Sequence, residues 1–186
     1  EAYKSDKIIG VVSQKDSTVE DPSVEDLNQI GTVANIIKML RMPDGNTTVI
    51  IQGKRRFKIN EVFNTDPYLQ ASIIPISDQK HVITDKEFIA LIDSLRDLSL
   101  QIITQSPNIP SEASFAIKNI ESPSFLINFI SSNMNADVAK KQQLLEMVDL
   151  KERATVVLEY LTRELQMLEL KNQIQSKVKV DIDKQQ

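Results

Sequence analysis

The residues that could do chemistry are few, and their spacing excludes the common enzyme sites. Gly53-Lys54 lacks both the Ser or Thr that follows a phosphate-binding lysine and the glycine five positions upstream. His81 is the single histidine, which excludes a histidine-based metal cluster, and we interpret it as an exposed linker residue. No serine lies in the G-x-S-x-G pattern of a nucleophile elbow. We therefore predict no catalytic, cofactor-binding or metal-binding residue in this sequence.

A basic run at residues 54–58, "KRRFK", is the remaining candidate for a charged site. Nucleic-acid binding needs such cations to converge with stacking aromatic side chains. Strand alternation, however, directs Phe57 to the opposite face from Lys58. We interpret Lys54, Arg56 and Lys58 as the solvated face of a strand, and nucleic-acid binding stays open as an alternative.

Composition indicates a globular protein. The 186 residues are enough for one compact domain or two small ones, and 41% hydrophobic residues are ample for a core. A net charge of −4 gives no global signal for nucleic acid. The absence of cysteine excludes disulfides and favours a reducing, cytoplasmic location. No apolar run approaches the ~20 residues that span a bilayer, and no signal-peptide pattern opens the sequence, so we expect no membrane partner.

The elements that must position these residues change character near residue 80. Residues 1–80 are predicted to form a β-rich subdomain, because all four glycines and many β-branched residues lie there. "PDGN" (43–46) provides proline for a fixed φ and glycine for a positive φ, so its flanking strands should form a hairpin. Gly53 is expected to end the second strand of that hairpin. The expected strands are 7–13, 31–41, 46–52, 54–63 and 69–76, with a polar loop at 14–30.

Residues 81–186 are predicted to form an α-helical subdomain. "TDKE" (84–87) is typical of a capping box with Thr84 as N-cap, and "SPNIP" (106–110) should end the helix that follows. Shorter helices are expected at 111–120, after the N-cap pair "SP" (122–123), and after Asn135. The residues expected to face the core are Phe88, Leu91, Ile92, Leu95, Leu98 and Ile102, then Phe125, Leu126, Phe129 and Ile130, then Val138, Leu144 and Leu145.

The last helix is predicted to be the longest. It should begin at "DLKE" (149–152), and Ala154, Leu158, Leu161, Leu165 and Leu168 follow a heptad spacing. No proline or glycine follows, so we expect about 30 residues of helix whose far half projects and seeks a partner.

One stretch resembles a known family. "IGTVANIIKMLRMPDGNTTVIIQGKRRFKI" (30–59) is similar to the N-terminal domain of the Lon family of ATP-dependent proteases, which carries G-T-V-A, "MPDG" and G-x-x-R segments in this order. Upstream, "KIIGVVSQKD" (7–16) and "VEDLNQIG" (24–31) also resemble family segments. Downstream, residues 164–186 look like the long helix that leads toward the family's ATPase module.

The resemblance implies an α+β fold: a PUA-like twisted β-subdomain, incomplete at its N-terminal edge, followed by an α-helical bundle that ends in a long projecting helix. It implies a non-catalytic module for substrate recognition and hexamer assembly in a Lon-type ATP-dependent serine protease. The Ser-Lys dyad, ATP and magnesium are expected in other parts of such a protease. The implied partners are unfolded or damaged polypeptides and further copies of the chain, with a possible dimer through the long helix.

A reader of unfolded chains needs exposed apolar surface on a stable scaffold. The candidates for this role are Met39, Leu40 and Met42 beside the Pro-Asp-Gly turn, and Phe63, Tyr68 and Leu69 at the next strand junction. Core packing is the alternative for these side chains. Two other functions stay open: a PUA-like nucleic-acid-binding domain, and a stand-alone protein with a Lon-type N-terminal domain and no ATPase.

Overall fold

The computed structural model describes residues 1–79 and 84–185, and it divides into two compact units. Residues 1–78 and 137–148 form the first, the strand unit, and residues 79–136 and 149–186 form the second, the helical unit. Strands precede helices along the chain, which confirms the predicted α+β class. The segment 137–148 groups with the strands, although the division at residue 80 put it with the helices. His81 lies outside the described residues.

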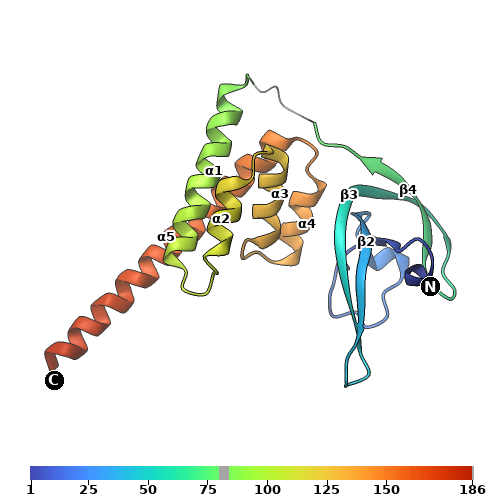
Figure 1. Cartoon of the computed structure of the whole chain (residues 1–186), viewed down its shortest axis with the longest axis horizontal. Coiled ribbons are helices and arrows are strands. Elements are labelled where there is room, and N and C mark those ends of the chain that lie inside the picture. Colours follow the sequence, from blue (N-terminus) through green and yellow to red (C-terminus); the bar gives the residue numbers. More distant parts are fainter. Residues whose placement is uncertain (80–83, 186) are drawn as a thin grey trace. The chain divides into compact units, whose positions relative to one another are not determined.

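The strand unit is built on an antiparallel sheet in which each strand pairs with its neighbours in the sequence (Figure 1). Its strands are β1 (Ile8–Val11), β2 (Ile30–Arg41), β3 (Thr47–Asn64) and β4 (Gln70–Ile76), and 3-10 turns η1 (Ala2–Lys4) and η2 (Val24–Asp26) precede β1 and β2. β1 pairs with residues 32–35 of β2, whereas β4 pairs with residues 56–64 of β3. The β2–β3 hairpin therefore extends beyond both outer strands.

The turn Pro43-Asp44-Gly45 closes this hairpin, as predicted. Gly45 has a φ of +87°, in the left-handed region that glycine adopts without a steric penalty. The backbone N–H and the side-chain amide of Asn46 both donate to the Asp44 carboxylate, at 2.9 Å each. These hydrogen bonds favour the ionised carboxylate and lower the pKa of Asp44. The turn is therefore fixed by its own residues.

Gly53 does not end a strand, so the prediction of two strands at 46–52 and 54–63 was wrong. β3 runs through this glycine without a break, and Gly53 pairs with Ala34 of β2. A register shift follows between the Val33 and Ala34 pairs, where β3 has one extra residue. Such a β-bulge lets a glycine lie inside a strand while the strand bends.

Gly31 allows the strand unit to close around Phe57, which is buried. A Cβ atom on Gly31 would lie 2.2 Å from the Val11 carbonyl oxygen and 3.1 Å from the Phe57 ring. A contact of 2.2 Å does not occur in folded proteins, so any larger residue here would force the backbone to move. Gly10 lies against the same ring, and a Cβ atom on it would be 3.1 Å from Phe57 Cζ.

Helix α4 (Val138–Glu146) packs on the strands through polar contacts. The Gln142 side chain donates to the Ile30 carbonyl oxygen (3.0 Å) and accepts from the Ser13 hydroxyl (3.0 Å). Asp137, not the predicted Asn135, is the N-cap of α4 and accepts from the Lys140 N–H (2.8 Å). Val138 is exposed rather than buried, because the first turn of α4 faces solvent on that side.

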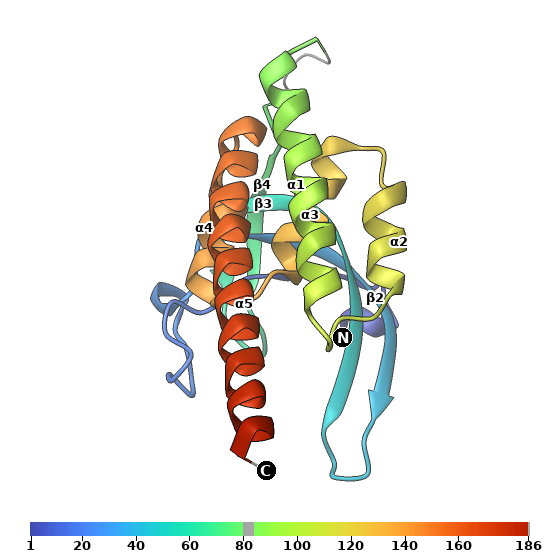
Figure 2. The same cartoon turned by 90° about the vertical axis from the view of Figure 1, so that its left-hand side faces the viewer.

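The helical unit contains α1 (Lys86–Gln105), α2 (Glu112–Asn119), α3 (Pro123–Asn133) and α5 (Leu150–Gln185). α1 and α5 lie side by side along much of α1 (Figure 2). Their interface and that with α3 hold the fully buried side chains Leu95, Leu126, Ile127, Ala154 and Val157.

Most helix starts follow the sequence signals. Ser122 caps α3 with Pro123 at the first turn, and Asp149 accepts from the first N–H groups of α5, as predicted. The predicted cap Thr84 was wrong by one residue. Asp85 is the N-cap of α1 and accepts from the Glu87 and Phe88 N–H groups, at 3.1 and 3.2 Å.

Two apolar patterns differ from expectation. In α3 the buried face is Leu126, Ile127 and Ile130, which leaves Phe125 exposed and Phe129 half-buried. In α5 the side chains are buried only as far as Leu165, and residues 169–184 are all exposed. The long helix with an exposed far half is therefore confirmed, at 36 residues.

Candidate functional site

The longest run of exposed residues in the strand unit is the projecting end of the β2–β3 hairpin. We call residues 37–55 the hairpin arm. Neither β1 nor β4 pairs with residues 37–41 of β2 or residues 47–55 of β3. Every residue from 37 to 55 is exposed. Because only two strands form the arm, both of its faces meet solvent.

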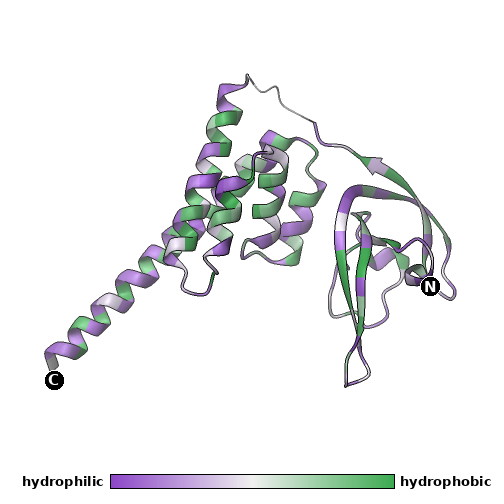
Figure 3. Ribbon diagram, viewed as in Figure 1, coloured by the Kyte–Doolittle hydropathy of each residue, from purple (hydrophilic) through white to green (hydrophobic). Residues whose placement is uncertain are grey.

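Three predicted site residues lie on this arm. Met39, Leu40 and Met42 expose 39%, 36% and 44% of their surface, so packing in the core is excluded for them. Figure 3 shows hydrophobic residues along both strands of the arm. Large apolar side chains at this exposure cost free energy unless a partner covers them.

The other three predicted site residues form a separate group at the β3–β4 junction. Phe63 exposes 64% of its surface, and Tyr68 and Leu69 are also exposed. β3 pairs with the arm's β2 residues near Thr47 and with β4 near Asn64, so the two groups lie at opposite ends of the same strand. The six residues therefore make two apolar patches, not one.

Sequence reasoning missed four further exposed residues of the arm. They are Ile37, Val49, Ile50 and Ile51. The run "TTVIIQ" indicated a strand, and β-branched strands are commonly half-buried. The available signal was length: the strands that flank the hairpin are both too short to cover its far end.

The register of the hairpin divides the arm into two faces. Met39 pairs with Val49, and Ile51 lies on the same side of β3 as Val49. This is the apolar face, which also carries Arg41 near the turn. Lys38 pairs with Ile50 on the opposite side, and the pairing of Arg55 with Val33 puts Arg55 on that side too. This second side, which also carries Leu40, is the basic face.

The basic run itself has two roles. Lys54, Arg55 and Lys58 are exposed, as expected for the solvated part of a strand. Among the described residues, the Arg55 side chain makes no hydrogen bond or ion pair, and the Lys54 ammonium donates only to Gln52 Oε1 (3.1 Å). These cations are available to a ligand.

Arg56 differs from its neighbours, and its assignment to the solvated face was wrong. Its guanidinium donates to the Leu145 and Met147 carbonyl oxygens, at 2.6 and 3.0 Å, and to the Asp78 carboxylate. Both carbonyls lie at the C-terminal end of α4, where helix carbonyls lack partners within the helix. Arg56 therefore holds α4 on the sheet.

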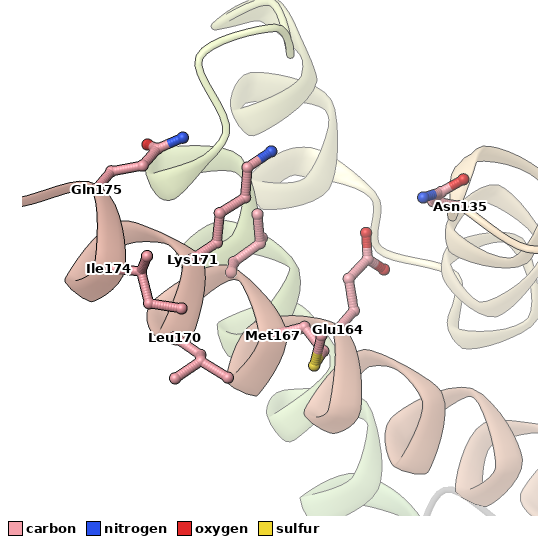
Figure 4. A pocket seen from close by; sticks show the side chains of 8 residues that line it. Asn135, Glu164, Met167, Leu170, Lys171, Ile174 and Gln175 are labelled. Carbon is pink, nitrogen blue, oxygen red and sulfur yellow. The ribbon is translucent and has the colours of Figure 1, made fainter. Parts of the chain in front are cut away.

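The helical unit has a second apolar region, on the exposed half of α5. A shallow hollow of about 540 Å³ runs along this helix. Figure 4 shows the side chains that line it, which come from α5 apart from Asn135. Burial raises the pKa of Glu164 at one end of the hollow. The apolar lining is Met167, Leu168, Leu170 and Ile174.

Neither region has the donor set of a metal site. Within residues 1–79 and 84–185, no three His, Asp or Glu side chains come together as metal ligands would. No helix in the same ranges combines the length and the apolar character needed to cross a bilayer.

Comparisons with known proteins found one family model and several relatives that match most or all of the chain. Residues 1–163 match the family model for the ATP-dependent protease La (LON) substrate-binding domain. A Lon protease of Flavobacterium johnsoniae is 59% identical over 186 residues, which are 100% of this chain and 23% of that protein. A Lon protease of Cytophaga hutchinsonii is 47% identical over 184 residues, 99% of this chain and 23% of that protein. The chain thus spans about 23% of the length of these relatives.

Solved structures match the fold. The N-terminal domain of the Mycobacterium avium complex Lon protease superposes with a TM-score of 0.64 at 22% identity, over 83% of this chain and 90% of that one. A Lon N-terminal domain protein from Xanthomonas campestris gives 0.54 at 16% identity, over 86% and 79% of the two chains. The shared fold and the match over residues 1–163 agree, and the chain belongs to the family of the ATP-dependent protease La (LON) substrate-binding domain.

Proposed function

We propose that this chain is the substrate-recognition segment of a Lon-type ATP-dependent protease, and that it binds unfolded or damaged polypeptides. The observation that carries the proposal is the hairpin arm, a two-stranded extension of the sheet whose apolar residues are all exposed between 37 and 55. Folded proteins bury most of their large apolar side chains, whereas unfolded polypeptides expose them. Apolar residues on the arm can therefore distinguish an unfolded polypeptide from a folded one without recognising a particular sequence.

The composition of the two patches fits a reader of many sequences. Met39 and Met42 have flexible, polarisable side chains that adapt to different apolar partners. Phe63 and Tyr68 offer large contact areas with few rotatable bonds. Because the patches lie at opposite ends of β3, one long unfolded chain could contact both, and two weak contacts on one chain reinforce each other.

The rest of the protease lies outside this chain in the proposal. An ATPase module would bind ATP and magnesium, and a Ser-Lys dyad would cleave the peptide bond, neither of which this segment supplies. The parent is proposed to be a hexamer in the cytoplasm.

Self-association through α5 has support from Met167, Leu170 and Ile174, which are exposed apolar residues around the hollow. A dimer of the 186-residue chain that Ile174→Lys dissociates in sedimentation measurements would favour it, whereas a monomeric wild type would refute it.

Nucleic-acid binding is less well supported. Arg56 is engaged with α4, and no aromatic residue occurs between 37 and 55 for a base to stack on. A stand-alone protein without an ATPase is the other alternative, and the length of the open reading frame distinguishes it from a protease.

The test compares two forms of one protein as ligand. A reduced and carboxymethylated protein, which cannot refold, should bind the chain, and its native disulfide-bonded form should not. Met39→Asp and Phe63→Asp should each weaken binding about tenfold or more, since each removes an apolar contact of a few kcal/mol. Their melting temperatures should not change. The control is Ile89→Asp on α1, where the side chain is 45% exposed. Equal binding of both ligand forms, or binding lost only in step with stability, would refute the proposal.

A further inference from the structure

The hairpin arm offers backbone groups as well as side chains. In an antiparallel pair, every second residue directs its N–H and C=O away from the partner strand. Along residues 47–55 of β3, no described strand accepts or supplies those hydrogen bonds. The free edge of β2 is shorter, at residues 37–41. The outer edge of β3 is therefore the longer free edge, and it continues the line along which β4 pairs with residues 56–64.

The two faces beside this edge differ in chemistry. The apolar face carries Val49 and Ile51, whose surfaces are 40% and 42% exposed. The basic face carries Arg55 and, across the hairpin, Lys38, together with the exposed apolar residues Ile50 and Leu40. Among the described residues neither cation has an ion pair, and Asp44 is the single acidic residue between 37 and 55. A strand laid along the edge would direct every second side chain to the face of Val49 and Ile51 and the others to the face that carries Arg55 and Lys38.

We propose that the outer edge of β3, residues 47–55, binds an extended segment of polypeptide as an added antiparallel strand. The segment that fits alternates apolar and acidic residues. Its backbone pairs with β3, its apolar side chains cover Val49 and Ile51, and its carboxylates approach Arg55 and Lys38. This inference rests on the proposed function and deepens it, because it states how the arm holds an unfolded chain and which segments it prefers.

Other occupants fit less well. A second arm of the same chain, paired antiparallel about Ile51, would place Lys54 and Arg55 opposite Thr48 and Thr47 of its copy, so it offers these cations no carboxylate. Nucleic acid would match the cations but not the aliphatic groups between them. A helix would meet the side chains of one face but leave the backbone edge unpaired.

Backbone methylation of a peptide separates strand addition from side-chain contact. The probe is a soluble 12-residue peptide in which valine and glutamate alternate. In one methylated form all valines carry N-methyl groups, and in the other all glutamates do. Because alternate N–H groups of a strand point to opposite edges, each form lacks the hydrogen-bond donors along one edge of the peptide. If the peptide adds to β3, one methylated form should lose affinity at least tenfold and the other should keep it. Equal loss in both forms, or loss in neither, would overturn the proposal.

Variants of the protein locate the contact. Val49→Thr with Ile51→Thr removes apolar surface but keeps residues that favour strands. It should weaken binding of the unmethylated peptide about fivefold or more. The control is Ile73→Thr with Ile74→Thr on β4, whose exposed fractions, 38% and 51%, are similar. The control should bind as the wild type does, and loss of affinity in the control alone would contradict the assignment to β3.

Two further ligands distinguish the possible failures. A peptide with lysine in place of glutamate should bind at least tenfold more weakly, and equal affinity would overturn the predicted preference for acidic segments. If the carboxymethylated protein binds but methylation of the peptide has no effect, strand addition is wrong and the proposed function stands. If a single-stranded RNA binds and neither polypeptide does, both proposals are wrong.

Discussion

Replacing Arg56 with alanine removes the guanidinium that joins β3 to the C-terminal end of α4. Lys58 is the matched control, because it lies on the same strand and in the same basic run but is exposed. The Arg56 side chain is 12% exposed, and its partner Asp78 is 17% exposed, so water screens this cluster only in part. We therefore expect Arg56→Ala to lower the free energy of unfolding much more than Lys58→Ala does.

The magnitude follows from the contacts. Arg56 donates to the Leu145 and Met147 carbonyls, at 2.6 and 3.0 Å, and to the Asp78 carboxylate. Deleting a charged donor costs about 1.5–3 kcal/mol for one such hydrogen bond, and the effects of bonds that share one group do not add fully. We expect Arg56→Ala to lower the free energy of unfolding of the strand unit by about 2–4 kcal/mol. Arg56→Lys keeps the charge but loses the planar fork, so about half of that loss is expected.

Urea unfolding followed by circular dichroism gives the free-energy difference, and hydrogen exchange of the α4 amides shows where it acts. Exchange in α4 should accelerate in Arg56→Ala and not in Lys58→Ala, whose stability should stay within about 0.5 kcal/mol of wild type. Equal stability of Arg56→Ala and Lys58→Ala would refute the conclusion that Arg56 holds α4 on the sheet.

Two other predictions concern the scaffold. The Phe88 N–H and Lys151 lower the pKa of Asp85, so this cap stabilises α1 above the ordinary carboxyl pKa of about 3.9 and loses its effect as the pH falls through the lower folded-state value. Asp85→Ala should therefore lower the melting temperature at pH 7, and its melting temperature should fall less than that of the wild type as the pH drops below about 4. Thr84→Ala should have neither effect. Similar effects of the two substitutions would contradict the assignment of Asp85 as the cap. Gly31→Ala should destabilise the strand unit by about 3 kcal/mol, because its Cβ would meet the Val11 carbonyl at 2.2 Å. Full stability of that variant in urea unfolding would show that the strand relaxes around the added methyl group.

Features that depend on local chemistry were predictable from the sequence. The Pro43-Asp44-Gly45 turn, the Ser122 cap and the start of the last helix each depend on a few adjacent residues, and each was confirmed. Thr84 and Asp85 are both good caps, and their order alone cannot decide between them. The strand end expected at Gly53 was wrong because the compensating bulge depends on a partner strand that the local pattern does not show.

Long-range contacts were the main source of error. Strand alternation predicts on which face of β3 Arg56 lies, but it does not predict that α4 covers this face. The Leu145 carbonyl that accepts from Arg56 is 89 residues further along the chain. The exposure of the arm has the same origin, because it depends on where β1 and β4 stop. The chemistry of Met39, Leu40 and Met42 was therefore enough to propose them as substrate-binding residues, which stays a prediction, but their separation from Phe63, Tyr68 and Leu69 needed the strand pairing.

Hydrogen exchange of the chain with a bound unfolded polypeptide tests the central claim most directly. The amides of the 186-residue chain would be followed with and without a saturating amount of a reduced, carboxymethylated protein. If the hairpin arm is the contact surface, exchange should slow within residues 37–55, most of all at the outward amides of β3, and should stay unchanged in α1 and α2. Slower exchange confined to the helical unit, or no change anywhere, would contradict the account.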